Sequence, residues 1–303
     1  MRKYFGTDGI RRIANTELTP DLVFRVAKAG AYVLAKHSDH TPTILIGRDT
    51  RISGTLIESA MTAGFLSYGA NVKLLGVTPT PAVAYLTREL NADASVVISA
   101  SHNGFADNGV KYFSNKGMKI PDEIEEEIEE IMDSEKLSTL IAVGENIGIS
   151  EQCTNYKEKY IQFFKNIFKD EFRGKNIRVG IDTANGATSE VAEKIFKELG
   201  IDCEIICNSP NGVNINDGCG STHLENISNF VKEKHLDLGI AYDGDGDRCL
   251  AVDENGNTMD GDVIMAIVAS YLKSKGNLKK DTLVATVMSN LGLKKFAETN
   301  NIQ

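Results

Sequence analysis

The sequence predicts an α/β protein in which one structural unit is repeated. Apolar segments of strand length alternate with helical segments, which is typical of a sheet covered by helices. Residues 44–76 contain an apolar strand, the motif G-x-D-T, a helix that ends in glycine and a second strand, and residues 177–207 repeat that order. Such repetition indicates several related α/β domains better than it indicates one large sheet.

Hydrophobic periodicity defines the elements of the first unit. The segment "TILIG" at 43–47 is typical of a buried strand, and the helical pattern at 53–69 is closed by a glycine. A strand at 71–77, a helix at 81–90 and a strand at 94–100 follow.

Residues 121–137 predict a further helix. Ile124, Ile128 and Ile131 share one face of this helix, and glutamates occupy the opposite face. A run of acidic residues on one helix face is usually solvated, so we expect these glutamates to be exposed.

A third copy of the unit opens at "TLVATVMSNLGLKKFAETNN" (282–301), and the chain ends at Gln303 before a returning strand can follow. A boundary is expected near 145–160, ahead of the helical pattern "YKEKYIQFFKNIF". We therefore expect three domains, at 1–151, 152–254 and 255–303, of which the third is incomplete.

The charge and hydropathy of the chain argue against several classes of protein. The formal net charge is −9, whereas a nucleic-acid-binding protein normally presents a basic face. No apolar run reaches the roughly 18 residues needed to span a bilayer, and the start "MRKYFGTDGI" lacks a secretory apolar segment. We expect a cytoplasmic protein without nucleic-acid or membrane partners, and the sequence leaves its oligomeric state open.

The five cysteines are scattered along the chain. Cys203 and Cys207 both lie in "CEIIC", where strand alternation places them on one face. A zinc site would need further ligands at short spacing, and the sequence shows none. Reduced, partly buried thiols are therefore expected.

The segment "YDGDGDRCLAVDENG" at 242–256 predicts a metal-binding loop. Asp243, Asp245 and Asp247 alternate with glycines after an apolar strand, so their carboxylates can converge on one hard cation. The spacing also resembles an EF-hand loop, but Arg248 stands where that loop needs glycine, and strands rather than helices flank the segment. Three solvated turn aspartates are the alternative, and they are costly without a cation. The sequence favours Mg²⁺.

The segment "ISASHN" at 98–103 places Ser101 at the end of a buried strand. It is not the G-x-S-x-G elbow of a serine hydrolase, and no carboxylate stands near to orient His102. A serine that carries a phosphoryl group fits better, with His102, Asn103, Lys111 and Arg11 as donors to the phosphate oxygens. A polar turn without function is an equal alternative on residue types alone.

Two further features allow a structural as well as a functional interpretation. Arg248 follows the aspartates and can bind phosphate oxygens, or it can form an ion pair with an aspartate. "GRDTRISG" at 47–54 puts Arg48, Asp49 and Arg51 at the carboxyl end of a strand, where open α/β sheets have their sites. We interpret the Arg48–Asp49 pair as structural. Neither a Walker loop nor a dinucleotide-binding glycine motif occurs.

Taken together, "FGTDGIR", "ISASHN", "DNGVKYF", "NINDGCGSTHLE" and "DGDGDRCLAVDENG" resemble the phosphohexomutase superfamily in order and spacing. The resemblance covers all 303 residues, and the first and fourth motifs favour the branch that acts on glucosamine phosphate. It implies repeated mixed-sheet α/β domains, of which the third is incomplete and the fourth absent here.

The resemblance also implies roles for individual residues. Ser101 is the phosphorylated serine, and Mg²⁺ is bound by Asp243, Asp245 and Asp247 together with the phosphate on Ser101. The remaining site residues are Arg11 and Lys111 at the phosphoryl group, His102 beside it, and Arg248 assisting proton transfer at the sugar hydroxyl. The implied reaction interconverts glucosamine 6-phosphate and glucosamine 1-phosphate through a bisphosphate, on the way to cell-wall amino sugars.

The sequence departs from the family pattern in three places. The sugar-recognition loop and the phosphate-anchoring domain fall outside the 303 residues, so we expect Mg²⁺ binding but poor turnover. Arg12 stands where the family has glycine and is expected to strain a loop that needs positive φ. Gly104 replaces a proline and is expected to loosen the serine loop.

Three alternatives stay open at this point. Phosphomannomutase or phosphoglucomutase activity differs only in the sugar. A Mg²⁺-dependent phosphatase would transfer the phosphoryl group to water in an open cleft. A non-catalytic module would bind metal or sugar phosphate without transferring a phosphoryl group to a sugar or to water.

Overall fold

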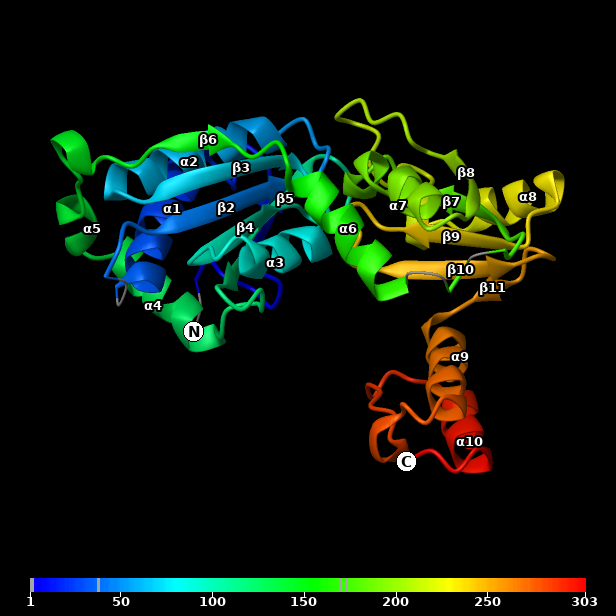
Figure 1. The fold of residues 1–303 in the computed structure, drawn as a ribbon. Helices are drawn as coiled ribbons and strands as arrows, with labels where there is room; N and C mark the ends of the chain where they lie inside the picture. The colour runs from blue at the N-terminus through cyan, green and yellow to red at the C-terminus, as the bar shows by residue number, and fades with distance from the viewer. Residues whose placement is uncertain (1–2, 37–38, 169–170, 173) are drawn as a thin grey trace.

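The computed structural model describes residues 3–36, 39–168, 171–172 and 174–303, and it contains two mixed sheets that lie side by side with a smaller helical part below the second (Figure 1). Helices cover both faces of each sheet, so the α/β class and the repeated mixed-sheet domains are confirmed. Within the described residues, no helix combines the length and apolarity needed to cross a bilayer.

The first sheet has six strands in the order β1-β5-β4-β2-β3-β6. The strands are β1 (Ile10–Ile13), β2 (Thr43–Arg48), β3 (Asn71–Val77), β4 (Ala94–Ile98), β5 (Asp107–Ser114) and β6 (Ser150–Gln152). Strands β4, β2, β3 and β6 run parallel, whereas β5 pairs antiparallel with both β1 and β4.

Alternation along the strands of the first sheet produces two separate cores. Ile44 and Ile46 of β2 face the core formed with α1, α2 and α4, and Leu45 between them faces the core formed with α3. The helices of this unit are α1 (Pro20–Ala35), α2 (Gly54–Tyr68), α3 (Thr80–Glu89), α4 (Asp122–Met132) and α5 (Lys136–Thr139), with the 3₁₀ turn η1 (Gly144–Asn146).

Two of these helices have clear terminal signals. Thr19 accepts a hydrogen bond from the Leu22 amide at the start of α1. Gly69, in the left-handed conformation with φ 106°, ends α2 as the sequence predicts.

The expectation that the glutamates of α4 are solvated is wrong for two of them. Glu129 is buried and accepts hydrogen bonds from the backbone amides of Lys3, Tyr4 and Phe5. Glu125 is also buried and pairs with Lys119 at 2.9 Å. Hydrophobic periodicity does not reveal this, because the N-terminal segment that binds Glu129 is distant in sequence and Lys119 lies outside the helix.

The second sheet has five strands in the order β11-β10-β9-β7-β8. The strands are β7 (Arg178–Asp182), β8 (Asp202–Ile206), β9 (Leu238–Tyr242), β10 (Cys249–Asp253) and β11 (Thr258–Met259). Its helical elements are α6 (Tyr156–Phe168), η2 (Ala187–Glu190), α7 (Ala192–Glu198), η3 (Gly220–Thr222) and α8 (Glu225–Lys234). The predicted division after residue 254 falls between two paired strands of this sheet, β10 and β11.

The last part of the chain is helical where the sequence predicts an opening strand. It contains α9 (Gly261–Ser274), η4 (Lys279–Asp281) and α10 (Leu291–Thr299). The apolar segment at 282–287 forms no strand, and its Val284 and Val287 are exposed. A strand needs a neighbour for its backbone hydrogen bonds, and no described residue offers an edge to this segment.

Candidate active site

Two loops from different sheets meet at Ser101. Ser101 follows β4, and the aspartate loop connects β9 to β10. Ser101 Oγ donates a hydrogen bond to Asp243 Oδ2 at 2.6 Å, and Arg248 Nη2 donates to Ser101 Oγ, also at 2.6 Å. The serine hydroxyl and the first carboxylate of the predicted metal loop are therefore in direct contact.

The backbone of Ser101 is held in an unfavourable conformation. Its φ is 54°, in the left-handed region, and its side chain is fully buried. Such a conformation costs a non-glycine residue about 1–2 kcal/mol, so other contacts must fix it. One is Ser99, whose Oγ accepts from the Ser101 amide at 2.9 Å.

The guanidinium of Arg51 holds most of the serine loop. It donates to the carbonyl oxygens of Ser101 at 3.0 Å, Asn103 at 2.9 Å and Asp107 at 3.0 Å, and also to that of Gly104. Four carbonyl groups of one loop thus converge on one side chain. Arg51 thus constrains the loop in which Gly104 stands, and the expectation that Gly104 loosens this loop stays a prediction.

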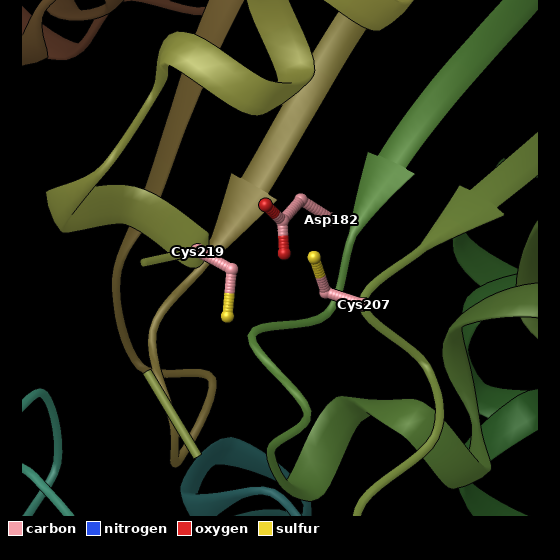
Figure 2. A group of neighbouring side chains, drawn as sticks. All are labelled: Asp182, Cys207 and Cys219. Atoms are coloured by element: carbon pink, nitrogen blue, oxygen red, sulfur yellow. The ribbon is translucent and has the colours of Figure 1, made fainter. Parts of the chain in front are cut away.

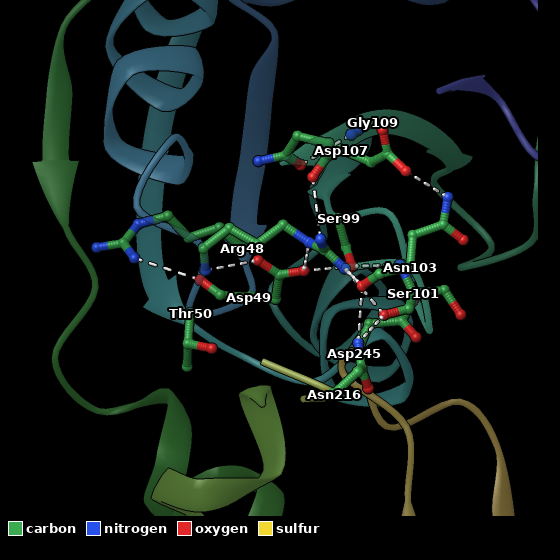
Figure 3. Close-up of polar contacts among 12 residues, drawn as sticks. Arg48, Asp49, Thr50, Ser99, Ser101, Asn103, Asp107, Gly109, Asn216 and Asp245 are labelled. Atoms are coloured by element: carbon green, nitrogen blue, oxygen red, sulfur yellow. Dashed lines mark hydrogen bonds and ion pairs between the residues drawn. The ribbon is translucent and has the colours of Figure 1, made fainter. Parts of the chain in front are cut away.

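Asp49 fixes Arg51 in turn. Its Oδ2 accepts from Arg51 Nε at 2.7 Å and from Ser99 Oγ at 2.6 Å, and both members of the ion pair are fully buried. Figure 3 shows Asp49 and Ser99 next to the loop that carries Ser101 and Asn103. Burial raises the pKa of Asp49, and the charge of Arg51 opposes this shift. The structural ion pair that we assigned to Arg48 and Asp49 is therefore formed by Arg51 instead, and Arg48 pairs with Glu58 at 3.3 Å.

Two side chains connect the two sheets at the site. Asn216, from the second domain, donates to the carbonyl oxygens of Ser101 at 2.8 Å and Asn103 at 3.1 Å. Thr80, at the start of α3, donates to Asp245 Oδ2 at 2.7 Å. The sequence analysis missed Asn216 and Thr80, because their partners lie 113 to 165 positions away and no local pattern links them.

The aspartate triad has the properties of a site for a divalent cation. One oxygen from each of Asp243, Asp245 and Asp247 lies within 4.8 Å of the others. Oδ1 of Asp245 is buried and has no hydrogen-bond partner among the described residues. Burial and the charge of Asp243 raise the pKa of Asp245, and burial and Asp245 raise the pKa of Asp247. A hard cation would relieve this repulsion and occupy the unpartnered oxygen.

The flanking strands β9 and β10 are antiparallel neighbours. The loop is therefore the turn of a hairpin and not an EF-hand, which requires two flanking helices.

Three cationic side chains lie near the triad. Arg248 Nε is 3.5 Å from both Asp243 Oδ2 and Asp247 Oδ1, so Arg248 contacts the serine and the aspartates together. Lys111 Nζ is 3.7 Å from Asp247 Oδ2. Arg11 pairs with Asp8 at 3.8 Å, and its buried Nε has no hydrogen-bond partner in the described part of the chain.

The structure also places His102 and Arg12, for which the sequence predicts a phosphate donor and a strained loop. His102 is exposed beside Ser101, and its ring makes no hydrogen bond to a described residue. Arg12 does not strain its loop: it lies in β1 opposite Asn108, where an extended backbone suits any side chain. The positive φ expected there is found at Gly9 instead, with φ 79°.

Three family models match the chain in sequence. They describe the alpha/beta/alpha domains I, II and III of phosphoglucomutase/phosphomannomutase, and they match residues 2–139, 158–256 and 260–303.

Curated relatives match over the whole chain. The phosphoglucosamine mutase of Bacillus subtilis (strain 168) is 53% identical over 303 residues, which are 100% of this chain and 67% of that protein. The phosphoglucosamine mutase of Ruminiclostridium cellulolyticum is 52% identical over 302 residues, with the same coverage. The chain thus spans about two thirds of the length of these relatives.

Solved structures share the fold at lower identity. A phosphoglucomutase/phosphomannomutase family protein from Burkholderia thailandensis aligns with a TM-score of 0.75 at 22% identity, over 91% of this chain and 60% of that one. The N-acetylphosphoglucosamine mutase of Aspergillus fumigatus, solved with GlcNAc-6P and magnesium, aligns with a TM-score of 0.54 at 18% identity, over 100% of this chain and 62% of that one.

Proposed function

Because the chain belongs to the phosphoglucomutase/phosphomannomutase family, and within it to the phosphoglucosamine mutases, we propose that it interconverts glucosamine 6-phosphate and glucosamine 1-phosphate through a phosphorylated Ser101. The enzymes of this family are isomerases that act by intramolecular phosphoryl transfer. The observation that carries the proposal is the contact of Ser101 Oγ with both Asp243 and Arg248.

The phosphoserine transfers its phosphoryl group to the free hydroxyl of the sugar phosphate. The bond between Ser101 Oγ and phosphorus breaks, and a bond from the sugar oxygen to phosphorus forms. The proton of the sugar hydroxyl ends on Ser101 Oγ, so the products are the bisphosphate and a free serine. Arg248 donates to Ser101 Oγ, so it stabilises negative charge on this oxygen as the bond breaks. The return of the other phosphate to Ser101 completes the exchange. The assistance of Arg248 in proton transfer at the sugar hydroxyl stays a prediction.

The triad fits Mg²⁺, the metal present in the solved Aspergillus structure. Asp243, Asp245 and Asp247 would hold the ion next to the serine. When bound, Mg²⁺ supplies positive charge that neutralises the oxygens of the transferring phosphoryl group.

The remaining side chains bind and orient the phosphoryl group. Lys111 and Arg11 bring positive charge to the side of the site occupied by Asp247, where they can bind phosphate oxygens. His102 is exposed beside the serine and can donate to the same oxygens. Arg51 and Asn216 orient the backbone of Ser101 without touching the substrate.

The proposal is tested by phosphoryl transfer to the purified chain. We expect incubation with glucosamine 1,6-bisphosphate and Mg²⁺ to add one phosphate to the peptide that contains Ser101, as measured by mass spectrometry. Ser101→Ala should remain unmodified while it still binds the bisphosphate, and Ser59→Ala, which alters an exposed serine of α2, should behave as wild type. A wild-type Ser101 that gains no phosphate would show that the assignment is wrong.

The products identify the activity more closely. Conversion of glucosamine 6-phosphate at a higher kcat/KM than mannose or glucose 6-phosphate supports the amino-sugar assignment. Inorganic phosphate released without glucosamine 1-phosphate identifies a phosphatase. The cytoplasmic location and slow turnover expected from the sequence stay predictions.

A further inference from the structure

A second cluster of metal-ligating side chains lies in the second domain. Asp182 is the last residue of β7, Cys207 directly follows β8, and Cys219 directly precedes η3. One carboxylate oxygen and the two sulfur atoms lie within 4.8 Å of one another. Figure 2 shows the three side chains reaching toward one another from these separate segments.

The cluster is not the thiol arrangement that the sequence suggests. Cys203 packs in the apolar core beside Val179 and Ile181. Cys207 has a φ of 51°, so strand alternation ends before it and its thiol meets Cys219 instead. All five cysteines are free thiols.

The ligand set suits a borderline or soft divalent cation. Two sulfurs and one oxygen are typical ligands of Zn²⁺ and differ from the three carboxylates of the first site. Tetrahedral Zn²⁺ with bonds of about 2.0–2.3 Å places its ligands roughly 3.5–4 Å apart. The three atoms already lie within 4.8 Å of one another, so side-chain movements of about 1 Å would bring them to this spacing as three of the four ligands.

Neighbouring hydrogen bonds orient the ligands. Asp182 Oδ1 accepts from the Ala184 amide at 2.8 Å, and Oδ2 accepts from the Gly220 amide at 2.9 Å. Asn185 Nδ2 lies 3.8 Å from Cys219 Sγ and donates to it. Outer hydrogen bonds of this kind fix metal ligands in place, and each carboxylate oxygen keeps a further lone pair for a cation.

The cluster gathers acidic groups without a cationic partner. Asp182 and Cys219 are buried, and no lysine, arginine or histidine of the described residues forms an ion pair with Asp182. Burial raises the pKa of Asp182, and the backbone hydrogen bonds oppose this shift. The hydrogen bond between the two thiols lowers the pKa of Cys219 and raises that of Cys207, and a cation that binds both sulfurs replaces their protons. A buried carboxylate without a cationic partner is unfavourable, and a bound cation would balance its charge.

We propose that Asp182, Cys207 and Cys219 form a binding site for a Zn²⁺-class divalent cation, separate from the Mg²⁺ site. The two cysteines lie at the two ends of the loop at 208–218, so a cation that binds both thiols closes this loop. The loop contains Asn216, which donates to the carbonyl oxygens of Ser101 and Asn103. The bound cation therefore holds in place the segment that reaches from the second domain to the serine.

Metal titration of the reduced protein tests the site. With a non-thiol reductant and no chelator, we expect one equivalent of Cd²⁺ per chain to produce a saturable thiolate-to-metal absorption in the ultraviolet, which Zn²⁺ displaces. The aspartate triad cannot produce this absorption because it offers only oxygen. Cys207→Ser and Cys219→Ser should weaken the binding at least tenfold, whereas Cys203→Ser and Cys249→Ser should leave it unchanged.

A measurement on the wild type keeps the test valid if the variants fold poorly. X-ray absorption at the zinc edge should show two sulfur ligands at about 2.3 Å. The proposal is overturned if the reduced wild type gives no thiolate–metal absorption, or if Cys207→Ser and Cys219→Ser variants that fold normally retain it. It is equally overturned if the two cysteines are isolated as a disulfide and bind no Cd²⁺ after reduction. None of these readouts depends on mutase activity.

Discussion

Single buried side chains determine the shape of the loop that carries Ser101. Arg51 alone donates to four carbonyl groups of this loop and is itself paired with Asp49. Of these four carbonyls, that of Gly104 also accepts from the Asp107 amide of the same loop, at 3.3 Å. The left-handed backbone of Ser101 is stable only because these contacts compensate for its conformational cost.

Loss of Arg51 should therefore destabilise the protein strongly. Arg51→Ala leaves Asp49 buried without its partner, and removal of one member of a buried ion pair costs about 3–5 kcal/mol. Lys197→Ala, which removes an exposed ion pair with Glu193, should change the free energy of unfolding by less than about 1 kcal/mol. Urea unfolding followed by circular dichroism compares the two variants, and equal effects would contradict the role given to Arg51.

Asn216 offers a more specific test of loop positioning. Asn216→Ala removes the donor shared by the carbonyls of Ser101 and Asn103, although Arg51 still binds both. We expect phosphorylation of Ser101 to slow by roughly 5- to 150-fold, which corresponds to about 1–3 kcal/mol. Mg²⁺ affinity, measured by calorimetry, should change little. A large loss of Mg²⁺ binding would indicate a general disruption of the site instead.

The ends of the parallel strands are where each domain places its polar groups. In the first domain β4 leads to Ser101, and in the second β7 and β9 lead to Asp182 and Asp243. Several residues after these ends have positive φ, among them Ser101 and Ala184. The backbone turns sharply there, so side chains from neighbouring strands converge at one edge of the sheet.

Gly220 shows how tightly such a turn is packed. Its φ is 75°, and a Cβ would lie 2.5 Å from the Tyr242 carbonyl oxygen and 2.6 Å from Ala184 Cβ. Gly276 has a similar φ of 69° with open space around it. Gly276→Ala should therefore lower the free energy of unfolding by about 1–2 kcal/mol, which is the cost of the left-handed backbone alone. Gly220→Ala should lower it clearly more, because the added Cβ also clashes. Thermal unfolding of both variants checks this, and equal losses would contradict the packing argument.

The active site also joins the two sheets to each other. Ser101 contacts Asp243 and Arg248, Thr80 contacts Asp245, and Asn216 contacts the serine loop, so hydrogen bonds at the site connect the first domain to the second. Binding of a cation between these loops should therefore stabilise both domains together, because it binds only the folded arrangement.

A substitution in the triad should raise the free energy of unfolding without Mg²⁺ but reduce the further gain from Mg²⁺. Mg²⁺ at 100 times its Kd should stabilise the wild type by about 2.7 kcal/mol, and a chelator should remove this gain. Asp245→Asn should be more stable than the wild type without metal, because burial and Asp243 make the charge on Asp245 unfavourable, but Mg²⁺ should stabilise it less. Calorimetric unfolding with and without Mg²⁺ measures both effects. A variant that responds to Mg²⁺ like the wild type would exclude the triad as the site.

The motifs of the sequence were sufficient to predict the α/β class, the repeated unit and the family. The resemblance to the phosphohexomutases also placed Ser101 and the aspartates at one site. Strand patterns alone could not do this, because the two loops end strands of different sheets. The helix at 53–69 was predicted almost to its observed bounds because its apolar periodicity and its terminal glycine are local signals.

What the sequence could not provide was the set of partners contributed by distant segments. Arg51, Asn216 and the pairing of Cys207 with Cys219 depend on contacts between elements far apart in the chain, as does the burial of Glu129. Likewise, the segment at 282–287 has the composition of a strand but no neighbouring edge to pair with. Local patterns specify which elements a segment favours, whereas hydrogen bonds and ion pairs between elements form only when the tertiary structure brings them within reach.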